Sequence, residues 1–328
     1  MARTFTSTQA SALYGAAIGE VWTTLEDAYN KNVFKQFLKE IKDPHAKRVT
    51  QQFAYFTQPV VKPEGEGIQY DDLKEGDPLS VDPEFYALGV RLTLEAIEKM
   101  RRQPFGSFNQ SQLTSASRIA EAFRKACAQR KEIKAAALIT GAQAVTGSAG
   151  RASGAGFDGK ALSATDHPIY SNTSVLGGTT FSNRGAASAL SQAALQTMLT
   201  TVETIPSLEG MVRPLGMKWK LLVGPGLRNT AYSVIETTRK GRTPGTTDHD
   251  VPGLSDFDIE VVVNPFLGAS STVYALIGPD HGLGYWEFMP EKLDDEADFE
   301  TKGHKYSIIG AWNETHEHAY DLMQSAGA

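Results

Sequence analysis

The sequence predicts an α+β fold of about two domains, because its 328 residues are long enough to form more than one hydrophobic core. Three observations support this fold class: a long helical pattern over 113–140, two extended segments joined by a polar tip over 50–95, and a βαβ-like pattern over 218–266. Hydrophobic residues make up 41% of the chain and charged residues 21%, which is typical of a globular protein. The 30 glycines and 15 prolines favour turns and long loops.

The N-terminal region contains a helical pattern. Apolar residues recur every three or four positions over 18–41, which is the spacing of one helix face; they are Ile18, Trp22, Leu25, Tyr29, Val33, Phe37 and Ile41. Such a helix could pack on its own core or form an arm on a neighbouring subunit. The sequence leaves both interpretations open.

The next region predicts a long hairpin. The extended segments QQFAYFTQPVV and FYALGVRLTLEAI flank a polar, glycine-rich stretch. This tip is strongly acidic, with only Lys62 and Lys74 opposing six carboxylates: Glu64, Glu66, Asp71, Asp72, Glu75 and Asp77. A hairpin of this length has little core of its own, so we expect it to pack on another element.

The clearest helix covers 113–140 and would be about 40 Å long at 1.5 Å per residue. Ile119, Phe123, Ala126 and Ile133 form its predicted apolar stripe, and Gly141 follows its end. A low-complexity loop comes next. The second half then predicts a helix over 188–205, the βαβ-like unit, and three more strands in STVYALIG, ADFETK and KYSIIGAWN.

Composition excludes several classes of protein. A net charge of −6 and a pI near 5.7 argue against a general nucleic-acid binder, whose affinity depends on clustered lysine and arginine. The single cysteine, Cys127, cannot form an internal disulfide. The first residues lack the apolar run of a secretory signal, and no stretch approaches the roughly 20 apolar residues of a membrane span. We therefore expect a soluble, cytoplasmic chain.

The stretch GAGFDGKALSATDHP, residues 154–168, contains the glycines and lysine of a phosphate-binding loop. Gly154, Gly159 and Lys160 fit that loop, but Ala161 stands where a magnesium-binding hydroxyl is needed. The overlapping glycine pattern of a dinucleotide fold, which includes Gly156, also lacks a strand before it and a helix after it. The sequence therefore predicts no nucleotide or cofactor site.

Other catalytic-looking residues are also interpreted as structural. Asp166 and His167 precede Pro168 and are expected to form a turn, because the residue before proline is held extended. His316 and His318 would share a strand face, and the loop GRTPGTTDHDVPG carries the 248–250 triplet Asp248, His249 and Asp250. The histidine pair has no obvious third metal ligand, and the triplet is similarly ambiguous, so both are expected on the solvated surface. We predict no catalytic, cofactor-binding or metal-binding residues.

Three blocks of sequence resemble the major capsid proteins of tailed phages, in particular the Mu-like major head subunit group. The blocks are YALGVRLTLEAIEKM (86–100), FDGKALSATDHPIYSN (157–172), and RPLGMKWKLLVGPGLRNTAYSVI with IEVVVNPFL (213–235 and 259–267). The resemblance implies the Johnson fold, the Hong Kong-type phage capsid fold. It implies five regions: an N-terminal arm (1–49), an extended E-loop (50–95), a peripheral domain (96–187) with a spine helix (113–140), an axial domain (188–268), and returning strands (269–328).

The resemblance also implies a function. The chain would self-assemble, as pentamers and hexamers, into the icosahedral head shell of a tailed phage that encloses double-stranded DNA. Implied partners are a separate scaffold protein, a portal, head accessory proteins and weakly bound packaged DNA, but no membrane. The chain would be a virion component assembled in the host cytoplasm. Asp248 and Asp250 would lie near the capsomer centre, where they need basic residues from a neighbour.

Two alternative functions remain at this point. The first is an encapsulin-like shell with the same fold, which would enclose protein cargo instead of a genome. The second is a soluble hydrolase that uses Asp166 and His167 or the pair His316 and His318. DNA or protein inside purified particles would separate the two shells, whereas a hydrolase would be active as a monomer.

Overall fold

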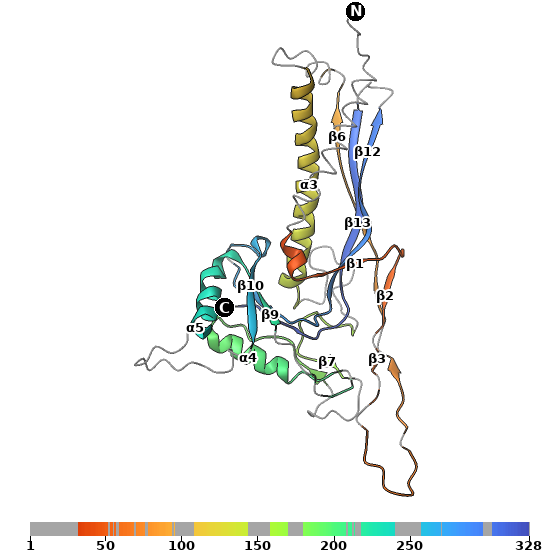
Figure 1. Ribbon diagram of the computed structural model, residues 1–328, viewed down its shortest axis with the longest axis vertical. Coiled ribbons are helices and arrows are strands. Elements are labelled where there is room, and N and C mark those ends of the chain that lie inside the picture. The colour runs from red at the N-terminus through yellow and green to blue at the C-terminus, as the bar shows by residue number, and fades with distance from the viewer. Residues whose placement is uncertain are drawn as a thin grey trace, which may run out of the picture.

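The protein is elongated, with a long helix and sheet at one end and a projecting hairpin at the other (Figure 1). The computed structural model describes residues 32–51, 53–54, 56, 59–68, 70–75, 78–93, 95, 108–143, 158–169, 180–207, 209–211, 213, 218–239, 257–269, 271–297 and 304–327. Within these residues, two four-stranded sheets and three smaller strand pairs form the β structure. Helices and strands both contribute, as an α+β fold requires.

The first sheet has the order β1-β12-β13-β6. Its long central strands are β12 (Leu283–Ala297) and β13 (His304–His316), which pair antiparallel. Strand β6 (Glu84–Leu92) pairs with β13 on one side, and the short β1 (Lys39–Lys42) runs parallel to β12 on the other. The predicted strand KYSIIGAWN is confirmed within β13. Of ADFETK, Ala297 ends β12, and residues 298–303 lie outside the described residues.

The long helix α3 (Phe108–Thr140) lies along this sheet (Figure 1). It starts five residues before the predicted start at Leu113, and its 33 residues correspond to about 50 Å at 1.5 Å per residue. The predicted stripe is correct at Phe123, which is 4% exposed, but wrong at Ile133, which is 45% exposed. Small and aliphatic residues bury the C-terminal half of the helix instead: Ala135, Ala136, Leu138 and Ile139.

The predicted helix over 18–41 is wrong in its last part, and residues 1–31 lie outside the described residues. A 3-10 helix, η1 (Val33–Gln36), occupies the start of the described part, and strand β1 follows it. Tertiary contacts override the helical spacing here. Phe34 and Phe37 pack in a core with the end of α3, and Ile41 packs so close to β12 that a Cβ on Gly284 would lie 2.7 Å from its Cδ1.

The second sheet has the order β10-β9-β11-β14. Strand β9 (Lys218–Val223), the 3-10 helix η2 (Pro225–Leu227), helix α5 (Arg228–Arg239) and β10 (Asp258–Val263) form a βαβ unit with parallel strands. The sequence prediction of this unit is confirmed. The short 3-10 helix η4 (Pro265–Leu267) leads into β11 (Tyr274–Ile277), and β14 (Leu322–Ser325) completes the sheet at its edge.

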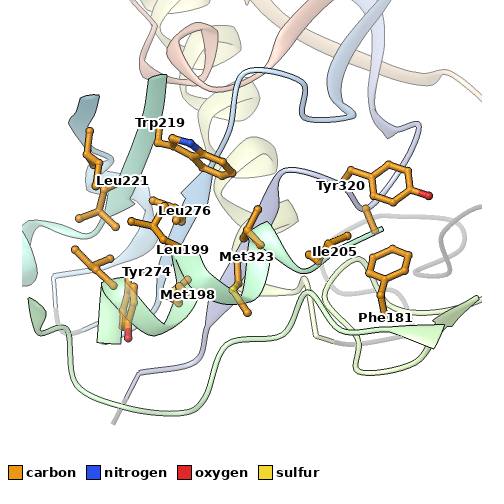
Figure 2. Close-up of a cluster of buried hydrophobic side chains, with 14 of the residues drawn as sticks. Phe181, Met198, Leu199, Ile205, Trp219, Leu221, Tyr274, Leu276, Tyr320 and Met323 are labelled. Carbon is orange, nitrogen blue, oxygen red and sulfur yellow. The ribbon is translucent and has the colours of Figure 1, made fainter. Parts of the chain in front are cut away.

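The second sheet is buried on both faces, because alternate residues of its strands point to opposite sides. One side packs on helix α4 (Gln192–Glu203), which the sequence predicts slightly too long. Figure 2 shows Met198 and Leu199 of α4 beside Leu221 and Leu276 of the sheet. The other side, which includes Leu222 and Ile277, joins the core formed with η1 and the end of α3. Ser191 caps the N-terminus of helix α4, and its side chain accepts a hydrogen bond from Ala194 N at 3.2 Å.

The hairpin is built from short strand pairs. Strand β2 (Arg48–Thr50) pairs with β5 (Leu79–Val81), and β3 (Phe53–Ala54) pairs with β4 (Lys74–Glu75). The predicted outer strand, FYALGVRLTLEAI, does not pair with QQFAYFTQPVV. It forms β6 and joins the first sheet, because β13 offers it nine consecutive partners. A further pair, β7 (His167–Pro168) with β8 (Thr180–Phe181), lies below the second sheet.

Candidate functional site

The projecting hairpin, residues 48–81, is the most exposed apolar surface of the described chain. It extends beyond the rest of the molecule, with β2 near its base and β3 further out (Figure 1). Large hydrophobic side chains on it are between 49% and 88% exposed: Val49, Phe56, Val60, Val61, Ile68, Tyr70 and Leu73. A contiguous exposed apolar surface is typical of a protein interaction site.

The hairpin tip also has the predicted acidic character. Glu64, Glu66, Asp71 and Asp72 are exposed there, and Glu75 accepts a hydrogen bond from Gln51 at 3.2 Å across the strand pair. Asp77 lies outside the described residues. Because the apolar and acidic side chains share one segment, the surface fits a partner that is apolar and basic.

The outgoing strand of the hairpin is anchored by ionic contacts. The guanidinium of Arg48 donates to the carboxylate of Glu317, which follows β13, and lies 3.8 Å from a carboxylate oxygen of Asp43. Trp286 of β12 donates from Nε1 to the carbonyl of Asp43 at 2.8 Å. These contacts fix the start of the hairpin to the first sheet.

The returning strand is anchored by a buried cluster. Lys134 of α3 donates from Nζ to Glu84 Oε2 at 2.7 Å and to Asn313 Oδ1 at 3.2 Å, and Glu314 Oε2 lies 3.4 Å away. Asn313 in turn donates to the carbonyl of Asp82 at 2.8 Å. Burial disfavours the charge of Lys134, but the nearby carboxylates outweigh it and raise the pKa of the lysine. Burial raises the pKa of Glu314.

The long helix is held on the sheet by charged residues as well as apolar ones. Lys131 lies 2.5 Å from Glu291 and 3.9 Å from Glu287 of β12, and Arg124 lies 3.8 Å from Glu291. The side chains of all four are between 10% and 13% exposed. Burial raises the pKa of Glu287 despite Lys131. These ion pairs and the Lys134 cluster fix the helix relative to the hairpin base.

The residues Asp166 and His167 do not form an acid–base pair. The carboxylate of Asp166 contacts Lys160, whereas Nδ1 of His167 lies 2.6 Å from Asp158 Oδ2 and Nε2 lies 3.1 Å from Asn183 Oδ1. His167 is 1% exposed. The sequence interpretation missed Asp158 and Asn183, because only the fold brings them to the histidine.

This buried network ties several segments together. Asn183 donates from Nδ2 to the carbonyls of Leu162 at 2.8 Å and Ala319 at 3.1 Å, and its Oδ1 accepts from Ala164 N at 2.9 Å. The ring of His167 stacks on Phe181 at a centroid distance of 5.1 Å. Through these contacts the network connects His167 and the 162–164 segment to Asn183 and to Ala319 near the C-terminus.

The remaining motif residues do not assemble a site. In the 154–160 stretch, residues 154–157 lie outside the described residues, and no helix follows Lys160, as a phosphate loop requires. The surface position expected for His316 is wrong, since it is 2% exposed at the end of β13, and His318 is only partly exposed. Among the described residues, no three histidine, cysteine, aspartate or glutamate side chains gather to hold a metal. Asp248, His249 and Asp250 lie outside the described residues.

A sequence model of the phage capsid protein family matches residues 76–313, which is more than half of the chain. The chain belongs to the phage capsid protein family. It is therefore a subunit of a phage head shell. The match includes the end of the hairpin, the long helix and most of both sheets. No curated protein sequence matches the chain.

Solved structures show the same fold. The capsid of a native GTA particle has a TM-score of 0.53 at 10% identity and covers 89% of both chains. The capsid of Myoviridae phage XM1 has a TM-score of 0.52 at 8% identity, with 88% of this chain and 90% of that chain covered. The mature capsid of bacteriophage PhiM1 has a TM-score of 0.50 at 12% identity, with 90% and 86% covered. These similarities confirm the α+β capsid fold. No helix in the described residues is long and apolar enough to cross a membrane.

Proposed function

We propose that this phage capsid protein is the major head subunit of a tailed phage of the Mu-like group. Pentamers and hexamers of the chain build an icosahedral shell around double-stranded DNA. The proposal includes the division of the chain into an arm (1–49), an E-loop (50–95), a peripheral domain (96–187), an axial domain (188–268) and returning strands (269–328).

The observation that carries the proposal is the projecting hairpin. Its apolar side chains are exposed in the single chain: Val61 and Tyr70 are each 88% exposed. The segment that carries them has little core of its own. Covering such a surface contributes roughly 25 cal/mol per Å² of apolar area removed from water. A neighbouring subunit can supply that cover. When each subunit makes several such contacts at once, the later contacts are effectively intramolecular and the shell becomes stable.

The charge balance supports weak contact between the shell and its DNA. A net charge of −6 disfavours tight, general binding to phosphates, so the genome can be packaged without adhering to the shell wall. We propose a separate scaffold protein, a portal and head accessory proteins as further partners. In this proposal the chain is assembled in the host cytoplasm and remains in the virion.

Negative-stain microscopy of the purified chain, alone and with its scaffold protein, tests this function. Closed particles of uniform size are expected in at least one of the two preparations. Nuclease-protected DNA inside particles from infected cells would support a genome shell, whereas a protein cargo in place of DNA would contradict it. A chain that stays monomeric under both conditions would overturn the proposal.

A further inference from the structure

Strand β6 has one open edge. Its residues 84–92 pair with β13 along their whole length, and within the described residues no strand pairs with the other side of Glu84–Val90. Exposed edges are normally protected by proline, charged side chains, especially lysine, or a bulge. Between Glu84 and Arg91, the stretch FYALGV contains no proline and no charged residue, and the register of β6 with β13 is continuous. This edge is therefore competent to accept another strand.

A groove runs beside the open edge, between β6 and helix α3. It has a volume of about 220 Å³, and Tyr86, Leu88, Cys127, Arg130 and Trp312 are among the residues that line it. Leu88 lies on the same side of the strand as Tyr86, yet it is 46% exposed. Strand addition combines main-chain hydrogen bonds with pockets for alternate side chains. The open edge and the groove supply both.

We propose that residues 67–73 of a neighbouring copy add as a strand to the open edge of β6 and place an apolar side chain in this groove. This segment, GIQYDDL, contains no proline. In an extended conformation Ile68, Tyr70 and Asp72 share one side. Ile68 is 67% exposed and Tyr70 is 88% exposed, so both are available in the single chain. The inference rests on the proposed function, since it needs a second copy.

Charge complementarity favours the hairpin as the occupant. Arg130 is exposed at the groove, where its guanidinium lies 5.3 Å from the centre of the Tyr86 ring. The incoming segment carries Asp71 and Asp72 directly after its apolar residues. An apolar side chain in the groove therefore brings carboxylates toward the guanidinium of Arg130. On the opposite limb of the hairpin, the exposed Val61 is followed by Lys62, a basic residue, whereas Tyr70 is followed by Asp71. Two prolines, Pro59 and Pro63, also lie beside Val61.

The single cysteine of the chain makes this contact measurable. Cys127 lines the groove, and burial raises the pKa of its thiol to about 11, so it reacts slowly unless another thiol is held beside it. A disulfide needs Cα atoms within about 7 Å of each other. A cysteine introduced at Tyr70 should therefore cross-link to Cys127 of the neighbouring copy only if the segment occupies the groove.

The experiment oxidises assembled particles of the Tyr70→Cys variant with copper phenanthroline and analyses them on a denaturing gel without reductant. Covalent dimers and longer ladders are expected, and they should disappear when Cys127→Ser is added. Val61→Cys is the matched control, because Val61 is equally exposed on the opposite limb, and it should give no ladder. Ile68→Cys replaces Tyr70→Cys if the latter does not assemble. Intact particles without cross-links from either position, or equal cross-linking from Val61→Cys, would overturn the inference while leaving the shell function standing.

Discussion

Lys134 of helix α3 and Glu84 at the start of strand β6 form an ion pair with 2.7 Å between Nζ and Oε2. The side chain of Lys134 is 2% exposed and that of Glu84 is 29% exposed, so the lysine lies in the interior where the hairpin returns to the body of the subunit. It connects helix α3 to the first residue of β6, the strand that follows the hairpin. The direction in which the hairpin projects therefore depends on a contact that is separated by 50 positions in the sequence.

Replacing Lys134 with methionine should strongly destabilise the subunit. The substitution keeps most of the side-chain volume but leaves Glu84 and Glu314 without their cation, and breaking a buried pair costs about 3–5 kcal/mol. Thermal or urea unfolding of the unassembled subunit measures the effect. Lys125→Met is the matched control, because Lys125 pairs with Glu121 on the exposed face of the same helix. An equal effect of the two substitutions would contradict a buried anchor.

Phe123→Ala should lower the free energy of unfolding by about 3 kcal/mol, the cost of removing a buried aromatic side chain. Phe123 packs with Ala120, Tyr306 and Ile308 between the helix and the first sheet. Ile133→Ala on the same helix should have a much smaller effect, because Ile133 is 45% exposed. Urea denaturation of both variants tests this order. A loss for Ile133→Ala as large as that for Phe123→Ala would favour the stripe predicted from the sequence, in which both side chains are buried.

His318 should make the folded subunit sensitive to acid. Burial lowers the folded-state pKa of His318 from 6.5 to about 4, with Arg213 and Lys39 adding to the effect. Between about pH 4 and pH 6.5, His318 binds more protons in the unfolded chain than in the folded chain. The stability contributed by the neutral ring is therefore complete above pH 6.5 and is lost as the pH falls toward 4.

The pH experiment compares the melting temperature of the wild-type chain with that of His318→Gln across this range. The wild-type chain should lose more stability than the variant between pH 6.5 and 4. The comparison with the variant is needed because other buried groups change stability in the opposite direction. Burial raises the pKa values of Glu287 and Glu314, so the stability that they contribute is lost as the pH rises. Identical pH profiles would contradict a folded-state pKa of His318 that lies below that of the unfolded chain.

Local patterns predict the elements that are stabilised by their own sequence. The βαβ unit is recognisable because β9 and β10 are short apolar runs on either side of an amphipathic helix, and α3 is recognisable because no proline interrupts it. Strand β1 could not be predicted in this way. Its KEIK sequence follows a helical spacing, and it is a strand because it pairs in parallel with residues 284–287 of β12.

The candidate site was predictable in composition but not in its contacts. The acidic tip and the absence of a hairpin core follow directly from the sequence over 50–95. The partners of its base do not, because Arg48 reaches Glu317 across 269 positions. The same limit explains His167, whose neighbour in sequence is Asp166 but whose partners in space are Asp158 and Asn183.

The most direct test of the account is shell assembly by a chain that lacks residues 60–78. This deletion removes the exposed apolar limb and the acidic tip but leaves both sheets, helix α3 and the ionic contacts at the hairpin base. Circular dichroism and sedimentation should show a folded, soluble subunit, and electron microscopy should show no closed shells under conditions where the full-length chain forms them. An unchanged yield of closed particles would contradict the claim that the hairpin holds neighbouring subunits together.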